Sequence, residues 1–99
     1  MAIHVVIKRK FKMNKPEELI PLLKELNQRA RTQPGYISTN TLQSKENPDD
    51  YLVVSVWESE DDWKSWFFNS ERKYIQDQID SLIGERTFYE LFNPLIQVD

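Results

Sequence analysis

The segment 51–57 is apolar on both faces, and this constrains the fold more than any other feature of the sequence. Alternate residues of a strand point to opposite faces. The apolar positions are Tyr51, Val53 and Trp57 on one face, and Leu52, Val54 and Val56 on the other. A sheet with one solvated face would alternate apolar with polar residues. Both faces of this strand therefore need a cover.

The other periodic segments predict the order strand, helix, strand, strand, helix, strand. The predicted strands are 3–11, 36–43, 51–57 and 86–92, and the predicted helical segments are 16–31 and 59–83, with a break at Asn69 and Ser70. This order is typical of the split βαβ, ferredoxin-like arrangement, an α+β fold in which both helices cover one face of an antiparallel sheet.

Local signals support the predicted helix boundaries. Pro16 suits a first helical position, but Pro21 implies that the first helix begins in earnest near Ile20 or kinks in its first turns. Ser59 and Asp62 resemble a capping box, which predicts a helix start after residue 59.

The length predicts one domain, residues 1–99, because no repeat or linker divides the chain. A chain of this size has a thin core. The helices can cover only one face of the sheet, so we expect the other face to pack against a second copy. The sequence therefore predicts a homodimeric barrel.

Composition excludes several classes of function. Thirteen Lys plus Arg against sixteen Asp plus Glu give a net charge of −3, which argues against nucleic acid as a partner. The chain has no cysteine and only one histidine, so we expect no metal site. No apolar run approaches the roughly 20 residues of a membrane helix, so we expect no membrane partner and a cytoplasmic location.

Several of these segments resemble the antibiotic biosynthesis monooxygenase family of dimeric α+β barrels. The resemblance rests on Pro34-Gly35-Tyr36, on the run 54–59, and on Trp63 and Trp66 in the helix that follows. The family includes cofactor-free oxygenases that make quinones from polyketides, haem degraders and other enzymes. The resemblance therefore implies the fold more firmly than the activity.

The resemblance also bears on haem. The haem degraders of the family use an asparagine on the first strand, a tryptophan on the second helix, and an iron-binding histidine ten residues after that tryptophan. In this sequence the corresponding positions fall near Ile7, on Trp66 and on Gln76. Two of the three groups are missing, so we expect no haem and no other cofactor.

Four residues are the candidate catalytic set. Trp66, together with Trp63, could form one wall of a cavity between helix and sheet, and Tyr74 and Arg86 could bind and stabilise a substrate anion. His4 is the natural general base. Each also has a structural interpretation, because indoles supply core area and a tyrosine, an arginine or a strand histidine often has no catalytic role. The basic run 8–10 is expected to be a solvated edge.

The family resemblance, taken together with these residues, implies two alternative functions. The first is a cofactor-independent monooxygenase that acts on a small aromatic or polyketide-like molecule. The alternative is a non-enzymatic protein that binds a small hydrophobic ligand. An oxygenase needs at least two polar groups facing the ligand, so the arrangement of Trp66, Tyr74 and Arg86 around one cavity is the feature that separates the two.

Overall fold

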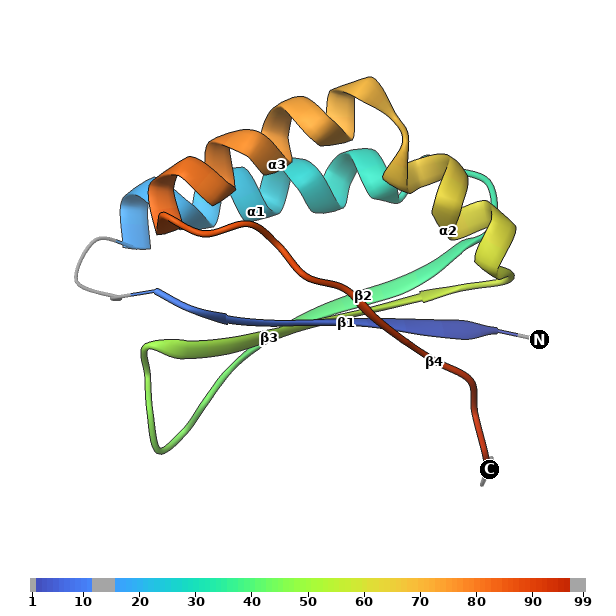
Figure 1. The fold of residues 1–99 in the computed structure, drawn as a ribbon, viewed down its shortest axis with the longest axis horizontal. Coiled ribbons are helices and arrows are strands. Elements are labelled where there is room, and N and C mark those ends of the chain that lie inside the picture. The colour runs from blue at the N-terminus through green and yellow to red at the C-terminus, as the bar shows by residue number, and fades with distance from the viewer. Residues whose placement is uncertain (1, 12–15, 97–99) are drawn as a thin grey trace.

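The computed structural model describes residues 2–11 and 16–96 (Figure 1). The elements in chain order are β1 (Ile3–Lys10), α1 (Pro16–Ala30), β2 (Tyr36–Gln43), β3 (Asp50–Trp57), α2 (Glu60–Phe67), α3 (Ser70–Ile83) and β4 (Glu90–Phe92). None of the helices in these described ranges is long and apolar enough to cross a membrane.

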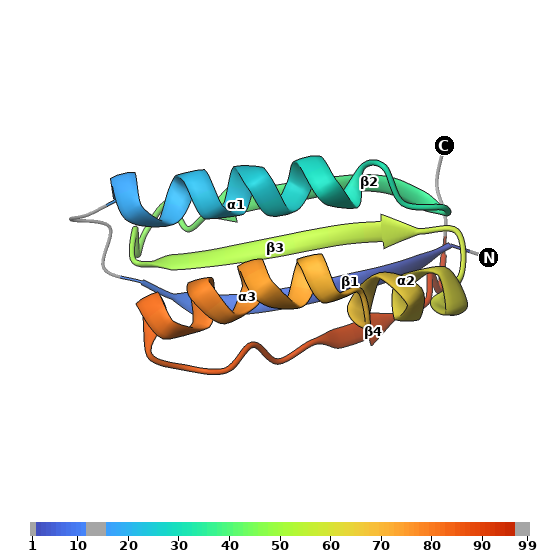
Figure 2. The same cartoon turned by 90° about the horizontal axis from the view of Figure 1, so that it is seen from above.

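The four strands form one antiparallel sheet in the order β2-β3-β1-β4. Figures 1 and 2 show that all three helices lie on the same face of this sheet, with α1 and α3 side by side. The predicted ferredoxin-like α+β fold is therefore confirmed.

The core lies between the helices and the sheet. Ile3 and Val5 of β1 and Trp57 of β3 are buried there, in a cluster with Ala30, Trp63 and Trp66. A second cluster contains Leu19, Tyr51, Ile75 and Ile79. The odd-numbered residues of β1 face the helices, as the alternation of the strand predicted.

The predicted boundaries of α2 and α3 are confirmed, whereas a start of the first helix near Ile20 is not found. Ser59 caps α2 by accepting a hydrogen bond from the Asp62 backbone N–H at 3.1 Å. Asn69 separates α2 from α3 and caps the second of them, and Gly84 ends α3 in the left-handed conformation. Helix α1 runs from residue 16 through Pro21.

Two expectations were wrong. The last strand is shorter than 86–92, because residues 86–89 run beside α3 and their side chains bond to it, whereas only 90–92 pair with β1. Arg9 does not belong to a solvated edge: it is only 6% exposed. As an odd-numbered residue of β1 it points under the helices, where it pairs with Asp80.

The face of the sheet away from the helices carries apolar side chains from all four strands. Residues paired across an antiparallel sheet share a face, so the register assigns to this open face Val6, Leu42, Leu52, Val54, Val56 and Phe92. None of the six is buried, and Leu42 and Phe92 are 52% and 48% exposed.

Candidate functional site

The candidate site is an internal cavity of about 50 Å³ between the helices and the sheet. Its lining residues are Val5 and Ile7 of β1; Leu26, Asn27 and Ala30 of α1; Thr39 of β2; Val53, Ser55 and Trp57 of β3; Trp63 and Trp66 of α2; Arg72 and Gln76 of α3; and Tyr89. One wall is aromatic, since Trp57 and Trp66 stack with centroids 6.4 Å apart.

The polar wall of the cavity comes from α3. Arg72, Gln76 and Asp80 follow one another at intervals of four residues, which places them in one row along the helix. This row faces the segment 85–89, which contributes Thr87 and Tyr89 to the same hydrogen-bond network.

Arg72 is a buried cation beside the cavity. It is 6% exposed. Its Nε donates to the Phe67 carbonyl and its Nη1 to the Tyr89 hydroxyl, both at 2.8 Å, and its guanidinium lies 4.7 Å from the centre of the Phe67 ring. Among the described residues, no carboxylate lies within ion-pair distance of Arg72. The site therefore carries a positive charge that no direct ion pair in the described part of the chain compensates.

Tyr89 lies between this cation and the rest of the network. Burial raises the pKa of the Tyr89 hydroxyl above 10.0, and the charge and hydrogen bond of Arg72 oppose that rise. The ring packs on Trp63 and Phe67, with centroids 5.7 and 5.4 Å away. The phenol is therefore neutral at physiological pH. Aromatic packing fixes its ring, and the hydrogen bond from Arg72 fixes its oxygen.

An ion pair between the buried Arg9 and the half-buried Asp80 supports the network. Arg9 Nη1 lies 3.0 Å from Asp80 Oδ1, and Arg9 Nη2 donates to the Glu85 carbonyl at 2.8 Å. The same Asp80 oxygen accepts from Gln76 at 3.0 Å and from Thr87 at 2.6 Å. Because Arg9 and Asp80 neutralise each other, they leave the charge of Arg72 unbalanced.

The pKa of Asp80 is the basis of a first prediction. Burial opposes its ionisation, but the hydrogen bonds from Thr87, Arg9 and Gln76 outweigh that effect and lower its pKa below 3.8. A depressed carboxyl pKa contributes stability that is complete above 3.8 and is lost as the pH falls through the folded-state value. Asp80→Asn should therefore destabilise the protein at neutral pH, and the difference from wild type should shrink in acid.

Urea unfolding of both proteins at neutral pH and at steps below pH 3.8 measures this difference. Asp77→Asn is the matched control, because Asp77 is an exposed carboxylate of the same helix. A loss of stability on Asp80→Asn that stays constant with pH would contradict the role of Asp80 ionisation.

The structure separates the four predicted site residues. Trp66 lines the cavity and is buried. Tyr74 is 69% exposed on the outer side of α3, and Arg86 is also exposed. His4 pairs with Val56 and Phe92, which places it on the open face of the sheet, opposite Ile7. The prediction that Trp66, Tyr74 and Arg86 surround one cavity was therefore wrong.

The polar groups that do face the cavity are Arg72, Gln76 and Tyr89. One sequence signal could have found two of them. The spacing of Arg72, Gln76 and Asp80 puts three polar residues in a single row beside the apolar positions Ile75 and Ile79. Such residues are usually solvated, and only a segment folded over the row makes it internal.

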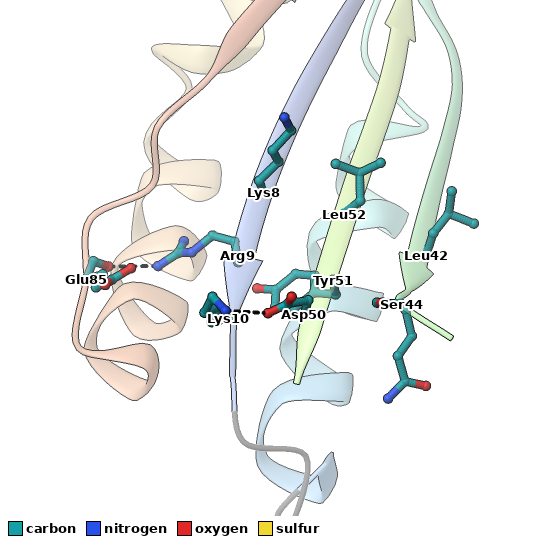
Figure 3. A pocket seen from close by; sticks show the side chains of 10 residues that line it. Lys8, Arg9, Lys10, Leu42, Ser44, Asp50, Tyr51, Leu52 and Glu85 are labelled. Carbon is teal, nitrogen blue, oxygen red and sulfur yellow. Dashed lines mark hydrogen bonds and ion pairs between the residues drawn. The ribbon is translucent and has the colours of Figure 1, made fainter. Parts of the chain in front are cut away.

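A second hollow, larger and more open, lies at one end of the sheet. This groove has a volume of about 680 Å³, and Leu42 and Leu52 form its apolar part (Figure 3). Figure 3 shows Arg9 directed towards Glu85 and away from Lys8, and Lys10 paired with Asp50 at 3.1 Å. Of its three cations, Arg9 and Lys10 already have carboxylate partners, and Lys8 is exposed, whereas Arg72 beside the internal cavity is buried.

The internal cavity can stabilise an anion. It combines one buried cation, a neutral phenol and aromatic walls, and a charged donor in a site with little water is stronger than in solution. A volume of about 50 Å³ holds no more than one or two water molecules. A ligand must therefore displace part of the wall. In the described part of the chain, no cluster of three or more His, Cys, Asp or Glu side chains could hold a metal ion.

Comparison with known families agrees with the fold. The model of the family described as antibiotic biosynthesis monooxygenase matches residues 2–78. This match covers the sheet strands β1 to β3 and most of α3, including Trp66, Arg72 and Gln76, but it ends before Tyr89.

Individual proteins give the same picture. The chain is 32% identical over 69 residues to Protein SchA of Streptomyces halstedii; the match covers 70% of this chain but only 18% of that protein. A conserved protein of Methanosarcina mazei Go1 has a TM-score of 0.84 at 24% identity, covering 93% of this chain and 91% of its own. SnoaB, a cofactor-independent oxygenase from Streptomyces nogalater, has a TM-score of 0.86 at 14% identity, covering 98% and 96%. At these identities, the two solved structures indicate a shared fold.

Proposed function

Because the chain belongs to the antibiotic biosynthesis monooxygenase family, we propose that it is a cofactor-independent monooxygenase acting on a small aromatic or polyketide-like molecule. Tyr74 and Arg86 do not face the cavity, so they do not supply the two polar groups that an oxygenase needs. Arg72 and Tyr89 take that place. The observation that carries the proposal is the buried Arg72, which has no carboxylate partner among the described residues and lies beside an aromatic cavity. An electron-rich phenol or enol that loses a proton supplies the missing negative charge.

The chemistry requires little from the protein beyond holding this anion. The substrate anion is the reductant and dioxygen the oxidant: a C–O bond forms at a ring carbon para to the phenolate oxygen, and the O–O bond breaks. One oxygen stays as the second carbonyl of a quinone, and the other leaves as water with the hydrogen of that ring carbon and the proton lost by the phenol. Arg72 stabilises the anion before oxygen attacks, and the aromatic wall of Trp57 and Trp66 holds the ring and excludes water.

Oxygen consumption tests this function. Electron-rich phenols and dihydroquinones are incubated with the protein in air without flavin, metal or nicotinamide, and the spontaneous rate of each compound is subtracted. We expect oxygen uptake above that rate and quenching of indole fluorescence by the bound compound. Binding without oxygen uptake across the whole panel would instead support the alternative, a non-enzymatic ligand-binding protein.

We further propose that the active form is a homodimer in which the open face of the sheet packs against a second copy. Six apolar side chains on that face support this proposal. Leu95 and Ile96, which are 95% and 80% exposed, add to the apolar surface, and Figure 1 shows the chain after β4 leaving on the side away from the helices. Covering such a surface is strongly favourable.

The dimer yields a second prediction. Sedimentation equilibrium at micromolar concentration should give twice the 11.9 kDa of one chain. Val54→Lys, at the centre of the open face, should give the single-chain mass, because it buries an unpaired charge at an interface. Ile20→Lys, on the exposed side of α1, is the control and should remain dimeric. A wild-type protein of 11.9 kDa would contradict the proposal.

A further inference from the structure

Along the polar wall of the cavity, a row of hydrogen-bonded side chains connects Asp80 to Arg72. The row passes through Thr87, Gln76 and Tyr89. Its two ends have chemical roles that cannot change. An ionised carboxylate only accepts hydrogen bonds, and a guanidinium only donates them. The direction of every bond in between can therefore be worked out from the ends.

At the Asp80 end, the carboxylate fixes which group donates in two hydrogen bonds, those of Thr87 and Gln76. Thr87 Oγ1 lies 2.6 Å from Asp80 Oδ1, so the threonine hydroxyl must donate to the carboxylate. Its oxygen is then an acceptor, and Gln76 Nε2 lies 2.8 Å from it and 3.0 Å from Asp80 Oδ1. Because Thr87 Oγ1 and Asp80 Oδ1 are both acceptors, the amide of Gln76 must direct its NH₂ group towards them. Its carbonyl oxygen Oε1 must face the other way, towards Tyr89.

From the Arg72 end, the hydroxyl of Tyr89 is oriented in the same sense. Arg72 Nη1 donates to the Tyr89 oxygen at 2.8 Å, so this oxygen is an acceptor. Gln76 Oε1 lies 3.5 Å from the same hydroxyl and receives its hydrogen. This bond is long and weak. It nevertheless gives the hydrogen of Tyr89 a partner within the protein.

We propose that Asp80 is a positioning residue: through Gln76 it holds the Tyr89 hydroxyl as an acceptor, so that in this row of side chains only Arg72 donates to a bound oxyanion. This inference rests on the proposed function only in that it takes the ligand to be an anion. On this proposal, the guanidinium of Arg72 alone recognises the anion in the cavity. Tyr89 accepts a hydrogen bond from that guanidinium and helps to hold it in place.

Two substitutions of Asp80 separate its acceptor role from its charge. Asp80→Asn removes the charge but can keep an oxygen at the position that accepts from Thr87 and Gln76. Asp80→Ala removes the acceptor as well. Arg9 Nη1, which also donates to Thr87 Oγ1, keeps that oxygen an acceptor, so the hydrogen of the Thr87 hydroxyl is free to go to the carbonyl of Gln76 and the amide can turn. The Gln76 NH₂ then meets Tyr89, whose hydrogen is released towards the cavity.

Nuclear Overhauser contacts of the Gln76 side-chain NH₂ in the ligand-free protein test the orientation. In the wild type we expect contacts from this NH₂ group to the Thr87 methyl group and not to the Tyr89 ring. Asp80→Asn is the matched control for Asp80→Ala and should show the same contacts as the wild type. In Asp80→Ala we expect the contacts to shift to the Tyr89 ring. The inference is overturned if the wild-type NH₂ contacts the Tyr89 ring, if Asp80→Ala leaves it unmoved, or if Asp80→Asn behaves like Asp80→Ala. The wild-type result decides the orientation even if Asp80→Ala does not fold.

Binding of 4-nitrophenolate supplies a functional readout. Tyr89→Phe should weaken this binding by less than about threefold in the wild-type background, because its hydrogen is not offered to the ligand and the Phe67 carbonyl still holds Arg72. In the Asp80→Ala background the same change should cost about three- to tenfold. An equal cost in both backgrounds overturns the inference. If no variant binds the probe, the anion-binding part of the proposed function fails, whereas the contacts in the ligand-free protein still decide the role of Asp80.

Discussion

Replacing Arg72 by methionine should lower the rate of substrate-dependent oxygen uptake by about 10²- to 10³-fold, the loss typical of removing one preorganised donor from a site that stabilises an anion. Methionine keeps an unbranched apolar side chain but has no charge. Because Arg72 is the buried cation without a carboxylate partner among the described residues, its loss leaves the substrate anion without its main stabilisation.

The control for this prediction is Arg86→Ala. Arg86 is exposed and does not line the cavity, so its removal should leave oxygen uptake within about twofold of wild type. Arg72→Lys should be intermediate, because lysine keeps the charge but cannot bond Phe67 and Tyr89 with one planar group. Thermal unfolding of each variant shows whether the fold is retained. A larger loss for Arg86→Ala than for Arg72→Met would show that the reaction takes place elsewhere.

Among substitutions that add one methyl group to a loop residue of this protein, Gly35→Ala should destabilise the fold most. Gly35 has a φ of 81°, and an added Cβ would lie 2.3 Å from the carboxyl carbon of Asp62 and 2.5 Å from its Cβ. A left-handed backbone costs a residue with a side chain about 1–2 kcal/mol. The overlap with Asp62 adds about 1–3 kcal/mol. We expect a total of roughly 3 kcal/mol, which lowers the Tm by about 12–24 °C in a domain of this size.

Gly84→Ala isolates the contribution of the collision. Gly84 has nearly the same φ, 83°, but an added Cβ would meet no atom within 4 Å. It should therefore cost only about 1 kcal/mol, or about 4–8 °C. Calorimetry of both variants measures the difference. Equal losses for the two would show that the Asp62 side chain moves aside without cost, and that the close approach of Gly35 does not hold the start of α2 in place.

Local chemistry made much of the fold predictable. The apolar pattern of β3, the cap formed by Ser59 and Asp62, and the break at Asn69 are all properties of short segments, and the structure has each of them where the sequence indicated. Trp66 was also predictable as a wall residue, because a large aromatic residue at a core-facing helical position is buried almost wherever the helix packs.

The polar residues of the site depended on long-range packing. Arg9, Arg72, Gln76 and Asp80 have side chains that solvate readily, so the sequence by itself favours placing them on the surface. The three residues of α3 are drawn inside because residues 85–89 cross over their row and supply Thr87 and Tyr89 as partners 7 to 17 residues away in the chain. The partners of Arg9 in the same region lie 71 to 78 residues away.

The sequence by itself thus determined the order of elements, the helix caps and the two apolar faces of β3, since these depend on side-chain periodicity and on bonds within a few residues. Only the tertiary structure decided which cation enters the cavity. Arg72 and Arg86 are chemically equivalent as residues, but the first is buried between α3 and Tyr89 whereas the second remains exposed. The reason is physical: a buried arginine needs hydrogen-bond acceptors at fixed positions, and those positions exist only once the chain has folded.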